Sequence, residues 1–223
     1  MVARRRRSQD SGLLIAVEGL DGSGKSTQIE LLLRHLTRQG LAVHRSNWNS
    51  SPAVHPLIRK LKAERRLTPH AFALVHAADF ADRYEREILP RLRLGIHVLC
   101  DRYVGTALAR DGARGLPREW IDKLYGFARP ADLTFYFRVP PEVAAARILR
   151  GRPAFSHYEA GLDLELADDP YESFLRFQSR VAAHYAAIAE GQGYHVIDAT
   201  LPMRLQQRVV RAQVRQLIAE GAR

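Results

Sequence analysis

Short apolar runs alternate with segments of helical periodicity along this chain. Runs rich in β-branched and aromatic side chains predict strands at 13–17, 41–46, 96–100, 133–139 and 194–198. Apolar side chains recur at helical spacing over residues 28–36, 56–66, 69–93 and 141–150. Strands that alternate with helices are typical of a parallel sheet with helices on both of its faces. The sequence therefore predicts an α/β three-layer fold with a sheet of five parallel strands.

Single residues mark several boundaries of these elements. Gly40 and Gly95 are placed to end helices, and Pro141 is placed to begin one at its first turn. With 223 residues the chain has the length of one domain, which we expect to span residues 11–223. The helix at 69–93 is predicted to bury one face, made of Leu74, Ala77, Ala78, Ala81, Tyr84 and Ile88.

The first ten residues differ from the rest of the chain. Residues 1–10 include four consecutive arginines, Arg4 to Arg7, and are predicted to form a disordered basic arm. The apolar run that follows has only about eight residues, which is too short to cross a membrane. The only cysteine, Cys100, excludes an intramolecular disulfide framework. It fits a small buried side chain in a reduced, cytoplasmic compartment.

The charge balance narrows the classes of ligand. The chain has 34 basic and 24 acidic residues, which gives a net charge of +10, and all but four of the basic residues are arginines. Such a charge suits polyanionic ligands, nucleotides and nucleic acids alike, and does not choose between them. Since lysine is scarce, a lysine inside a functional motif is less easily explained by chance.

A phosphate-binding motif follows the first predicted strand. Gly19, Gly24, Lys25 and Ser26 match the spacing G-x-x-x-x-G-K-[ST] between an apolar run and a helical pattern. In this motif backbone N–H groups surround phosphate oxygens, the lysine neutralises the outer phosphates, and the hydroxyl group binds Mg²⁺. The N-terminus of the following helix adds partial positive charge. The predicted site for the phosphates of a nucleoside triphosphate consists of Gly22, Ser23, Gly24, Lys25, Ser26 and Thr27.

Further candidate residues follow the third predicted strand. Asp101 stands at the end of the apolar run 96–100, where its carboxylate can hold Mg²⁺ or the waters around it. Arg102 beside it can bind a phosphate group through two nitrogen atoms. The alternative for both residues is an ordinary ion pair at the end of a strand. No N-K-x-D motif occurs in the chain, which disfavours a regulatory GTPase.

Five segments resemble the thymidylate kinase family of nucleoside monophosphate kinases. They are EGLDGSGKST at 18–27, HAAD at 76–79, CDRY at 100–103, VPPEVAAARI at 139–148 and VIDA at 196–199. The resemblance implies a P-loop kinase with a five-stranded parallel sheet, ATP and Mg²⁺ on the donor side, a nucleoside 5′-monophosphate as acceptor, and a homodimer. It also implies roles for single residues. Asp21 is expected near the sugar hydroxyl of the acceptor, Asp101 near Mg²⁺ with Ser26, and Arg102 on the acceptor phosphate.

The resemblance also implies a lid, at approximately 150–170. Gly22 stands where some family members carry an arginine, so we expect the compensating charge to come from Arg147, Arg150 and Arg152 of the lid. The alternative for each arginine is solvated surface charge. The predicted catalytic residues are Lys25, Asp101, Arg102, Arg150 and Arg152. The lid also has an acidic run that the sequence does not explain, made of Asp163, Glu165, Asp168 and Asp169.

The predicted acceptor pocket departs from the family pattern. Family members have a phenylalanine that stacks on the base and, four residues later, an arginine that reads its edge; His76 and Phe80 occupy these positions here. Arg110 and Asp111 replace a tyrosine and a glutamine. His76 can stack on a base or pack against its neighbours. Weak discrimination between pyrimidines is expected, unless Arg83, one helical turn past Phe80, supplies the contact with the base. The predicted acceptor-binding residues are Asp21, His76, Phe80, Arg83, Arg102, Arg110 and Asp111.

Three functions remain open on the sequence alone. The first is a nucleoside monophosphate kinase with dTMP as the default acceptor. The second is a kinase with the same catalytic frame and a different small acceptor. The third is a binding protein or an NTPase stimulated by nucleic acid, which would use the net charge and the basic arm. Neither specific nucleic-acid binding nor membrane association is expected.

Overall fold

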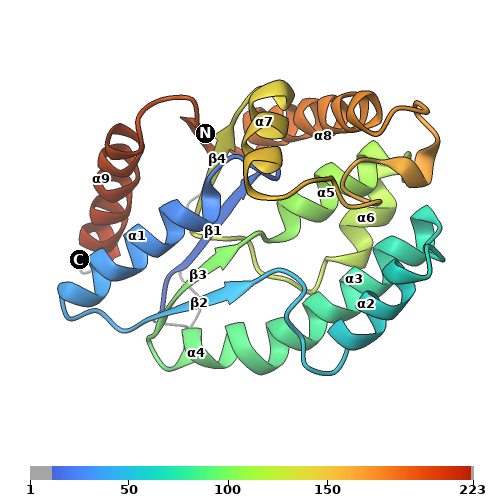
Figure 1. Cartoon of the computed structure of the whole chain (residues 1–223). Coiled ribbons are helices and arrows are strands. Elements are labelled where there is room, and N and C mark those ends of the chain that lie inside the picture. The colour runs from blue at the N-terminus through green and yellow to red at the C-terminus, as the bar shows by residue number, and fades with distance from the viewer. Residues whose placement is uncertain (1–11, 222–223) are drawn as a thin grey trace.

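A sheet of five parallel strands forms the centre of the molecule (Figure 1), in the order β2-β3-β1-β4-β5. This computed structural model describes residues 12–221, so the basic arm predicted at 1–10 lies outside the described residues. The strands are β1 (Leu14–Gly19), β2 (Val43–Asn47), β3 (His97–Asp101), β4 (Leu133–Arg138) and β5 (His195–Asp198). The predicted sheet is confirmed, and each strand lies close to its predicted position.

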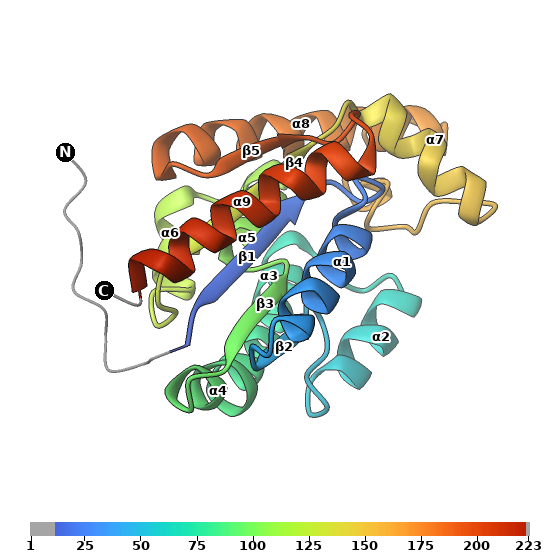
Figure 2. The same ribbon diagram turned by 90° about the vertical axis from the view of Figure 1, so that its left-hand side faces the viewer.

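Helices cover both faces of this sheet (Figures 1 and 2). On one face α1 (Lys25–Arg38) packs with α9 (Met203–Gly221), and on the other α5 (Val104–Ala113) packs with α8 (Pro170–Gln192). The described residues also form α2 (His55–Ala63), α3 (Pro69–Arg83), α4 (Leu89–Arg93), α6 (Arg118–Leu124), α7 (Pro141–Gly151) and the short turns η1 (Tyr84–Ile88) and η2 (Leu162–Leu164). None of the helices between residues 12 and 221 is both long and apolar enough to cross a membrane.

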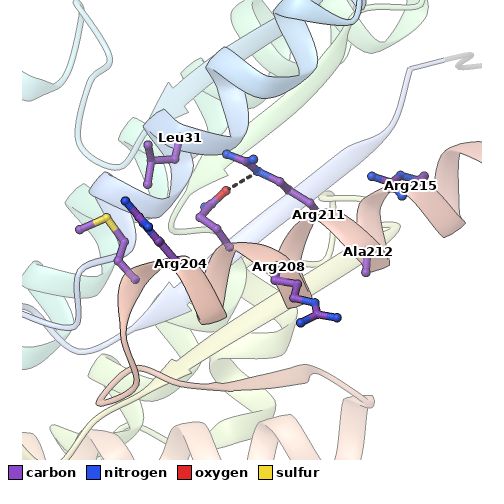
Figure 3. Close-up of a pocket in the computed structure, with 8 residues that line it drawn as sticks. Leu31, Arg204, Arg208, Arg211, Ala212 and Arg215 are labelled. Carbon is purple, nitrogen blue, oxygen red and sulfur yellow. Dashed lines mark hydrogen bonds between the residues drawn. The ribbon is translucent and has the colours of Figure 1, made fainter.

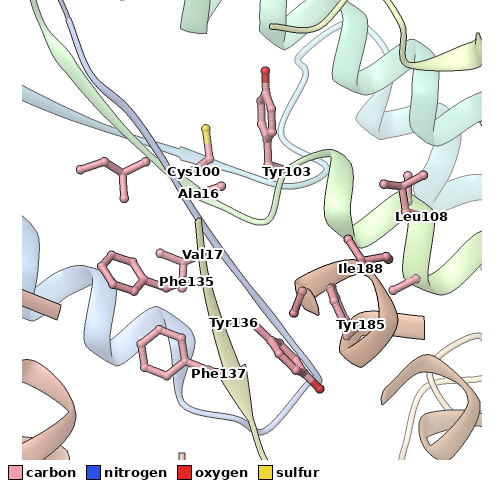
Figure 4. Close-up of a cluster of buried hydrophobic side chains, with 14 of the residues drawn as sticks. Ala16, Val17, Cys100, Tyr103, Leu108, Phe135, Tyr136, Phe137, Tyr185 and Ile188 are labelled. Atoms are coloured by element: carbon pink, nitrogen blue, oxygen red, sulfur yellow. The ribbon is translucent and has the colours of Figure 1, made fainter. Parts of the chain in front are cut away.

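Strand burial follows from the order of the sheet. The central strand β1 has a strand on either side and helices over both faces, so all 6 of its residues are buried. The edge strand β5 buries only Ile197. Figure 4 shows the middle of the core, where Tyr136 of β4 stacks on Tyr185 of α8 with ring centroids 5.1 Å apart. Cys100 is fully buried in this core, as its apolar surroundings in the sequence predict.

The predicted helix at 69–93 is present, but with a π-helical turn and a different buried face. α3 passes through η1 into α4 next to Pro90, whose missing N–H group prevents a regular helical hydrogen bond. The predicted burial is wrong for Leu74, which is 50% exposed, and for Ala78, which is also exposed. The helix instead buries Asp79 and Arg83, whose ion pair of 3.1 Å compensates both charges.

Parallel pairing brings the candidate residues to one edge of the sheet. Val17 of β1 lies opposite Asp101 of β3, so the loops that follow these two strands emerge side by side. In open parallel sheets the carboxyl ends of the strands form the edge where ligands bind. The segment after β1 and the segment after β3 therefore meet in one site.

Candidate active site

The phosphate loop joins β1 to α1 through glycines in the left-handed conformation. Gly22 has φ 77°, and a Cβ atom there would lie 2.5 Å from the carbonyl oxygen of Ala144 in α7. Gly24, with φ 86°, immediately precedes α1. Only glycine adopts this conformation without strain. The loop therefore leaves the N–H groups at the start of α1 open to an anion, as the motif predicts.

Lys25 lies inside this loop and is 5% exposed. Its Nζ atom donates hydrogen bonds to the Leu20 carbonyl oxygen at 2.6 Å and to Ser23 Oγ at 3.2 Å. Burial, followed by the nearby positive charge of Arg102, lowers the pKa of Lys25 to about 7. The ammonium group therefore lacks a full counter-charge in the free site, and phosphate oxygens would supply one.

Ser26 and Asp101 are in direct contact, although 75 residues separate them in the chain. Ser26 Oγ donates to Asp101 Oδ2 at 2.7 Å, and Arg45 of β2 donates to the same oxygen at 2.7 Å. A hydroxyl and a carboxylate are hard oxygen donors of the kind that bind Mg²⁺ together with phosphate groups. These side chains fit the predicted Mg²⁺ site. Thr27 is exposed in the first turn of α1.

Two arginines converge on Asp21 at the edge of the phosphate loop. Arg102 and Arg110 each form an ion pair with this carboxylate. Burial alone would raise the pKa of Asp21, but the two guanidinium groups hold it well below its usual range. Arg102 also donates to the Gly19 carbonyl oxygen at 3.0 Å and to Thr106 Oγ1 at 3.3 Å. This cluster brings three predicted acceptor-binding residues together and is net positive, as an anion site requires.

Glu18 supports this cluster, and its role was not predicted. It is only 1% exposed and accepts hydrogen bonds from the backbone N–H groups of Tyr103 at 2.8 Å and Thr106 at 3.1 Å. The Thr106 and Tyr185 hydroxyls donate to its other oxygen. Burial raises the pKa of Glu18. Glu18 thereby fixes the start of α5 and the position of Arg102. A carboxylate inside an apolar strand was the available signal, because a buried charge requires partners.

A cavity of about 430 Å³ opens beside Asp21. Its lining consists of Asp21, Lys62, Ala63, Phe72, Arg110, Arg152, Ser156, His157, Tyr158 and Glu159. The cavity thus joins the arginine cluster to the lid segment. Of the predicted acceptor-binding residues, Asp21 and Arg110 line it, and Arg102 lies next to it through its ion pair with Asp21. His76, Phe80, Arg83 and Asp111 do not line it.

His76 lies behind this cavity and is 2% exposed. Its ring stacks on that of Phe72 with centroids 4.0 Å apart. The Trp48 ring also stacks on it, with centroids 6.5 Å apart. The Nδ1 atom is 2.7 Å from the Phe72 carbonyl oxygen, which can only accept, so Nδ1 carries the proton. Burial lowers the pKa of His76 well below its ordinary value, so the ring is neutral. Nε2 is therefore a buried acceptor, and it has no partner within the described residues.

Phe80 and Arg83 lie deeper in the protein. Phe80 is fully buried among aromatic rings, including those of Tyr103 at 5.1 Å and Tyr125 at 5.4 Å. Arg83 is 1% exposed and binds Asp79 and Ser46. The structure does not bring these two side chains to the cavity beside Asp21. Sequence spacing placed them near the base, but aromatic packing and the buried ion pair hold them in the core.

Asp111 is also buried, with 2% of its surface exposed. Burial raises its pKa to about 7, although Arg114 and Arg110 act in the opposite direction. One of its carboxylate oxygens, Oδ2, has no partner among residues 12–221. Asp111 can thus hold a proton near neutral pH, which makes it a hydrogen-bond donor or acceptor according to its protonation state.

The predicted lid follows α7, and buried polar contacts hold it against the residues after α5 and before α3. Arg114, the residue after α5, donates to Asp163 at 2.9 Å and to the Tyr158 carbonyl oxygen at 2.8 Å. The Leu67 N–H group donates to the Tyr158 hydroxyl at 2.9 Å. Asp169 caps α8 by accepting from the N–H group of Glu172. Two members of the unexplained acidic run therefore have structural roles: Asp163 anchors the lid and Asp169 starts the next helix.

The three arginines of the lid differ in their surroundings. Arg147 donates to the Ala199 carbonyl oxygen at 2.9 Å and so joins α7 to the segment after β5. Arg152 forms an ion pair with Glu159, and both residues line the cavity beside Asp21. Arg150 is exposed and forms no ion pair with another described residue. Arg147 also has no ion pair among the described residues, but its guanidinium group is held by carbonyl oxygens, whereas that of Arg150 is exposed.

Removing one member of the Arg114–Asp163 pair should destabilise the protein strongly. The two side chains are 0% and 5% exposed, so Asp163→Ala leaves a buried guanidinium group without its counter-charge. We expect the free energy of unfolding to fall by about 3–5 kcal/mol. The double variant Arg114→Met/Asp163→Ala should lose less, because it buries no unpaired charge. Urea denaturation of both variants measures the difference.

The control for this experiment is Arg176→Met. Arg176 and Glu172 form an exposed ion pair, with 56% and 53% of their side-chain surfaces accessible, so its loss should cost about 1 kcal/mol or less. If the double variant loses as much stability as Asp163→Ala, the lid is not held by compensation of a buried charge.

Comparison with known proteins assigns this arrangement to a family. The family model described as thymidylate kinase matches residues 17–210. A probable thymidylate kinase 2 from Saccharolobus solfataricus is 43% identical over 94% of this chain and 96% of its own. A probable thymidylate kinase from Pyrobaculum aerophilum is 38% identical over 83% of this chain and 88% of its own. A thymidylate kinase from Thermomicrobium roseum is 36% identical over 94% of this chain and 97% of its own. The chain therefore belongs to the thymidylate kinase family.

Proposed function

We propose that this protein transfers the terminal phosphate of ATP to the 5′-phosphate of dTMP, with ADP and dTDP as products. The observation that carries the proposal is the meeting of Lys25 and Ser26 with Asp101 and Arg102 at one edge of the sheet. Such a site can hold two phosphorylated molecules with their charged ends facing each other. The names of the relatives supply dTMP as the acceptor.

In this mechanism the protein acts mainly by position and charge. A phosphate oxygen of the acceptor attacks the γ-phosphorus of ATP, and the bond from that phosphorus to the bridging oxygen of ADP breaks. Lys25 and the N–H groups before α1 stabilise the donor phosphates, and Arg102 holds the acceptor phosphate. Ser26 and Asp101 would hold Mg²⁺, which neutralises charge on the donor phosphates when bound. Arg150 can approach the transferred group from the lid.

Two other functions were left open by the sequence and are not favoured. Relatives named thymidylate kinase align over most of the chain, which argues against a different acceptor and against an NTPase that nucleic acid stimulates. The family resemblance extends the proposal to a homodimer in the cytoplasm. Light scattering on purified protein tests the dimer.

The acceptor base is the second part of the proposal, and it rests on His76, whose ring lies behind the cavity against Phe72. A neutral imidazole whose buried Nε2 can only accept matches the N3–H group of thymine. Cytosine has a lone pair at N3, which would face the lone pair of Nε2. We therefore expect clear discrimination between thymine and cytosine. This reverses the expectation from the sequence, which rested on Phe80 in place of an arginine.

Release of ADP with dTMP, dUMP, dCMP, dGMP and 3-methyl-dTMP tests the proposal. We expect kcat/KM to be highest for dTMP and about 10–100-fold lower for dCMP and 3-methyl-dTMP, because the buried acceptor then stays unpaired. His76→Phe keeps a stacking ring, removes the acceptor, and should shrink this discrimination while leaving KM for ATP unchanged. Activity on none of the five contradicts the kinase proposal. Equal use of dTMP and 3-methyl-dTMP contradicts only the role of His76.

ATP binding should take up a proton at Lys25. In the free site the pKa of Lys25 is lowered to about 7, by burial first and by Arg102 next, so the side chain is mostly neutral at pH 8. Bound phosphates raise this pKa again, and binding at pH 8 should therefore take up about 0.9 proton. Affinity for ATP should fall as the pH rises above about 7, by up to about tenfold per pH unit.

Calorimetry at pH 8 in two buffers with different ionisation enthalpies measures this uptake. Lys25→Met has no titrating group at this position and should show uptake near zero. An equal uptake by the variant and the unmodified protein would assign the proton to another group.

A further inference from the structure

A groove between α1 and α9 lies outside the proposed active site (Figure 3). It has a volume of about 630 Å³, and none of the phosphate-loop or lid residues discussed above lines it. Leu31, Met203 and Ala212 contribute apolar surface. Its basic side chains come from one helix, α9, and are Arg204, Arg208, Arg211 and Arg215.

These four arginines form a row along one face of α9. Their spacing of four, three and four residues places them on the same side of the helix. Eleven residues separate the first from the last, which corresponds to about 16 Å along a helix. The row is therefore longer than the triphosphate group of one nucleotide and matches an extended chain of negative charges.

The positive charge of this row is not compensated within the described residues. Arg204, Arg208 and Arg215 form no ion pair there, and α9 has no acidic residue before Glu220. Like charges four residues apart destabilise a helix, so the row works against the stability of α9. Burial lowers the pKa of His35 on α1, and Arg211 and Arg215 lower it further, which places α1 within reach of the same charge.

Gln207, the uncharged polar side chain of the groove, is already engaged by its neighbours and is not free to read a base. Arg211 donates to Gln207 Oε1 at 2.9 Å, and the amide nitrogen of Gln207 donates to the side chain and backbone of Gln28. No aromatic ring lines the groove. Contacts would therefore be to phosphate groups through guanidinium forks and to apolar faces through Leu31 and Met203.

We propose that the α1–α9 groove binds the phosphodiester backbone of single-stranded nucleic acid without regard to base sequence. A phosphodiester chain carries regularly spaced charges whatever its sequence, which suits a row of arginines. Unpaired nucleotides also expose apolar faces to the groove, whereas a duplex hides them. An acidic protein would need a matching row of carboxylates and is the alternative occupant.

Fluorescence anisotropy with a labelled oligo-dT 12-mer tests the proposal on the full chain. The variant R204Q/R208Q/R215Q removes three charges from the row and keeps Arg211, which contacts Gln207. The matched control, R59Q/R138Q/R180Q, removes three exposed arginines elsewhere that also form no ion pair within residues 12–221. ATP and dTMP are added in one arm to fill the proposed active site.

We expect the α9 variant to bind the oligonucleotide at least tenfold more weakly at 50 mM salt than the unmodified protein. The slope of log K against log salt should become shallower by about 2, since each contact with a single-stranded phosphate contributes about 0.7. The control should change affinity less than threefold. Kinase activity of the α9 variant should be unchanged, and ATP with dTMP should not displace the oligonucleotide.

Several results would overturn the proposal. Equal losses in the two variants would assign binding to the net charge, including the arginines at 4–7, which both variants retain. Displacement by ATP and dTMP would assign it to the active site. Tighter binding of a duplex of equal length, or displacement of oligo-dT by poly-glutamate at lower total charge, would identify a different occupant.

Discussion

Lys25→Ala should lower turnover by about two orders of magnitude or more while the protein keeps its fold. Lys25 binds only oxygen atoms of its own loop, the Leu20 carbonyl and the Ser23 hydroxyl, so no packed apolar group depends on it. In the proposed reaction the same ammonium group faces the phosphates, and loss of a donor of this kind typically costs 10²–10³-fold in kcat. Steady-state kinetics with ATP and dTMP, together with circular dichroism, measures both parts.

Lys123→Ala is the control for this experiment. Lys123 is exposed on α6 and is absent from the site, so both turnover and stability should stay close to those of the unmodified protein. Turnover of a correctly folded Lys25→Ala variant within a fewfold of the unmodified protein would show that this loop is not the phosphate site of a kinase.

Arg102→Lys should reduce the use of the acceptor much more than the use of ATP. Arg102 spreads its nitrogen atoms over the Gly19 carbonyl oxygen, Thr106 Oγ1 and Asp21, and a lysine has only one nitrogen to place. The proposed forked contact of Arg102 with the acceptor phosphate would be lost as well. We expect kcat/KM for dTMP to fall about 100-fold and KM for ATP to change less than about threefold.

The same arginine-to-lysine change at a surface position is the control, and it shows whether the loss of dTMP use is specific to Arg102. Arg118→Lys alters an exposed ion pair with Asp122 and should leave both constants unchanged. If Arg102→Lys weakens ATP and dTMP equally, Arg102 supports the whole loop and does not select the acceptor.

The sequence predicted the elements and residues that depend on local pattern. The phosphate loop was identifiable because its spacing, the preceding strand and the following helix all agree. The contact between Ser26 and Asp101 follows from parallel strands that end at one edge. The buried face of α3 was not predictable from apolar spacing, because it contains Asp79 and Arg83, which neutralise each other inside the protein, whereas Leu74 is exposed.

Contacts between distant segments explain most of what the sequence left open. Asp163 pairs with Arg114 across 49 residues, and Glu18 meets Tyr185 across 167. No periodicity links such positions, so the sequence did not show which residues anchor the lid or which partners Glu18 would have. Glu18 alone gave a signal, since a carboxylate in a fully buried strand must find donors in the folded protein.

The close approach of Gly22 to α7 limits how this sequence can change. Some family members carry an arginine at the corresponding position, but any Cβ atom here would lie 2.5 Å from the Ala144 carbonyl oxygen, and φ is 77°. An arginine could enter only after α7 had moved away. Because the clash is with a backbone oxygen, no replacement of Ala144 alone would relieve it. Moving the positive charge from the lid to position 22 of the loop therefore requires more than one substitution.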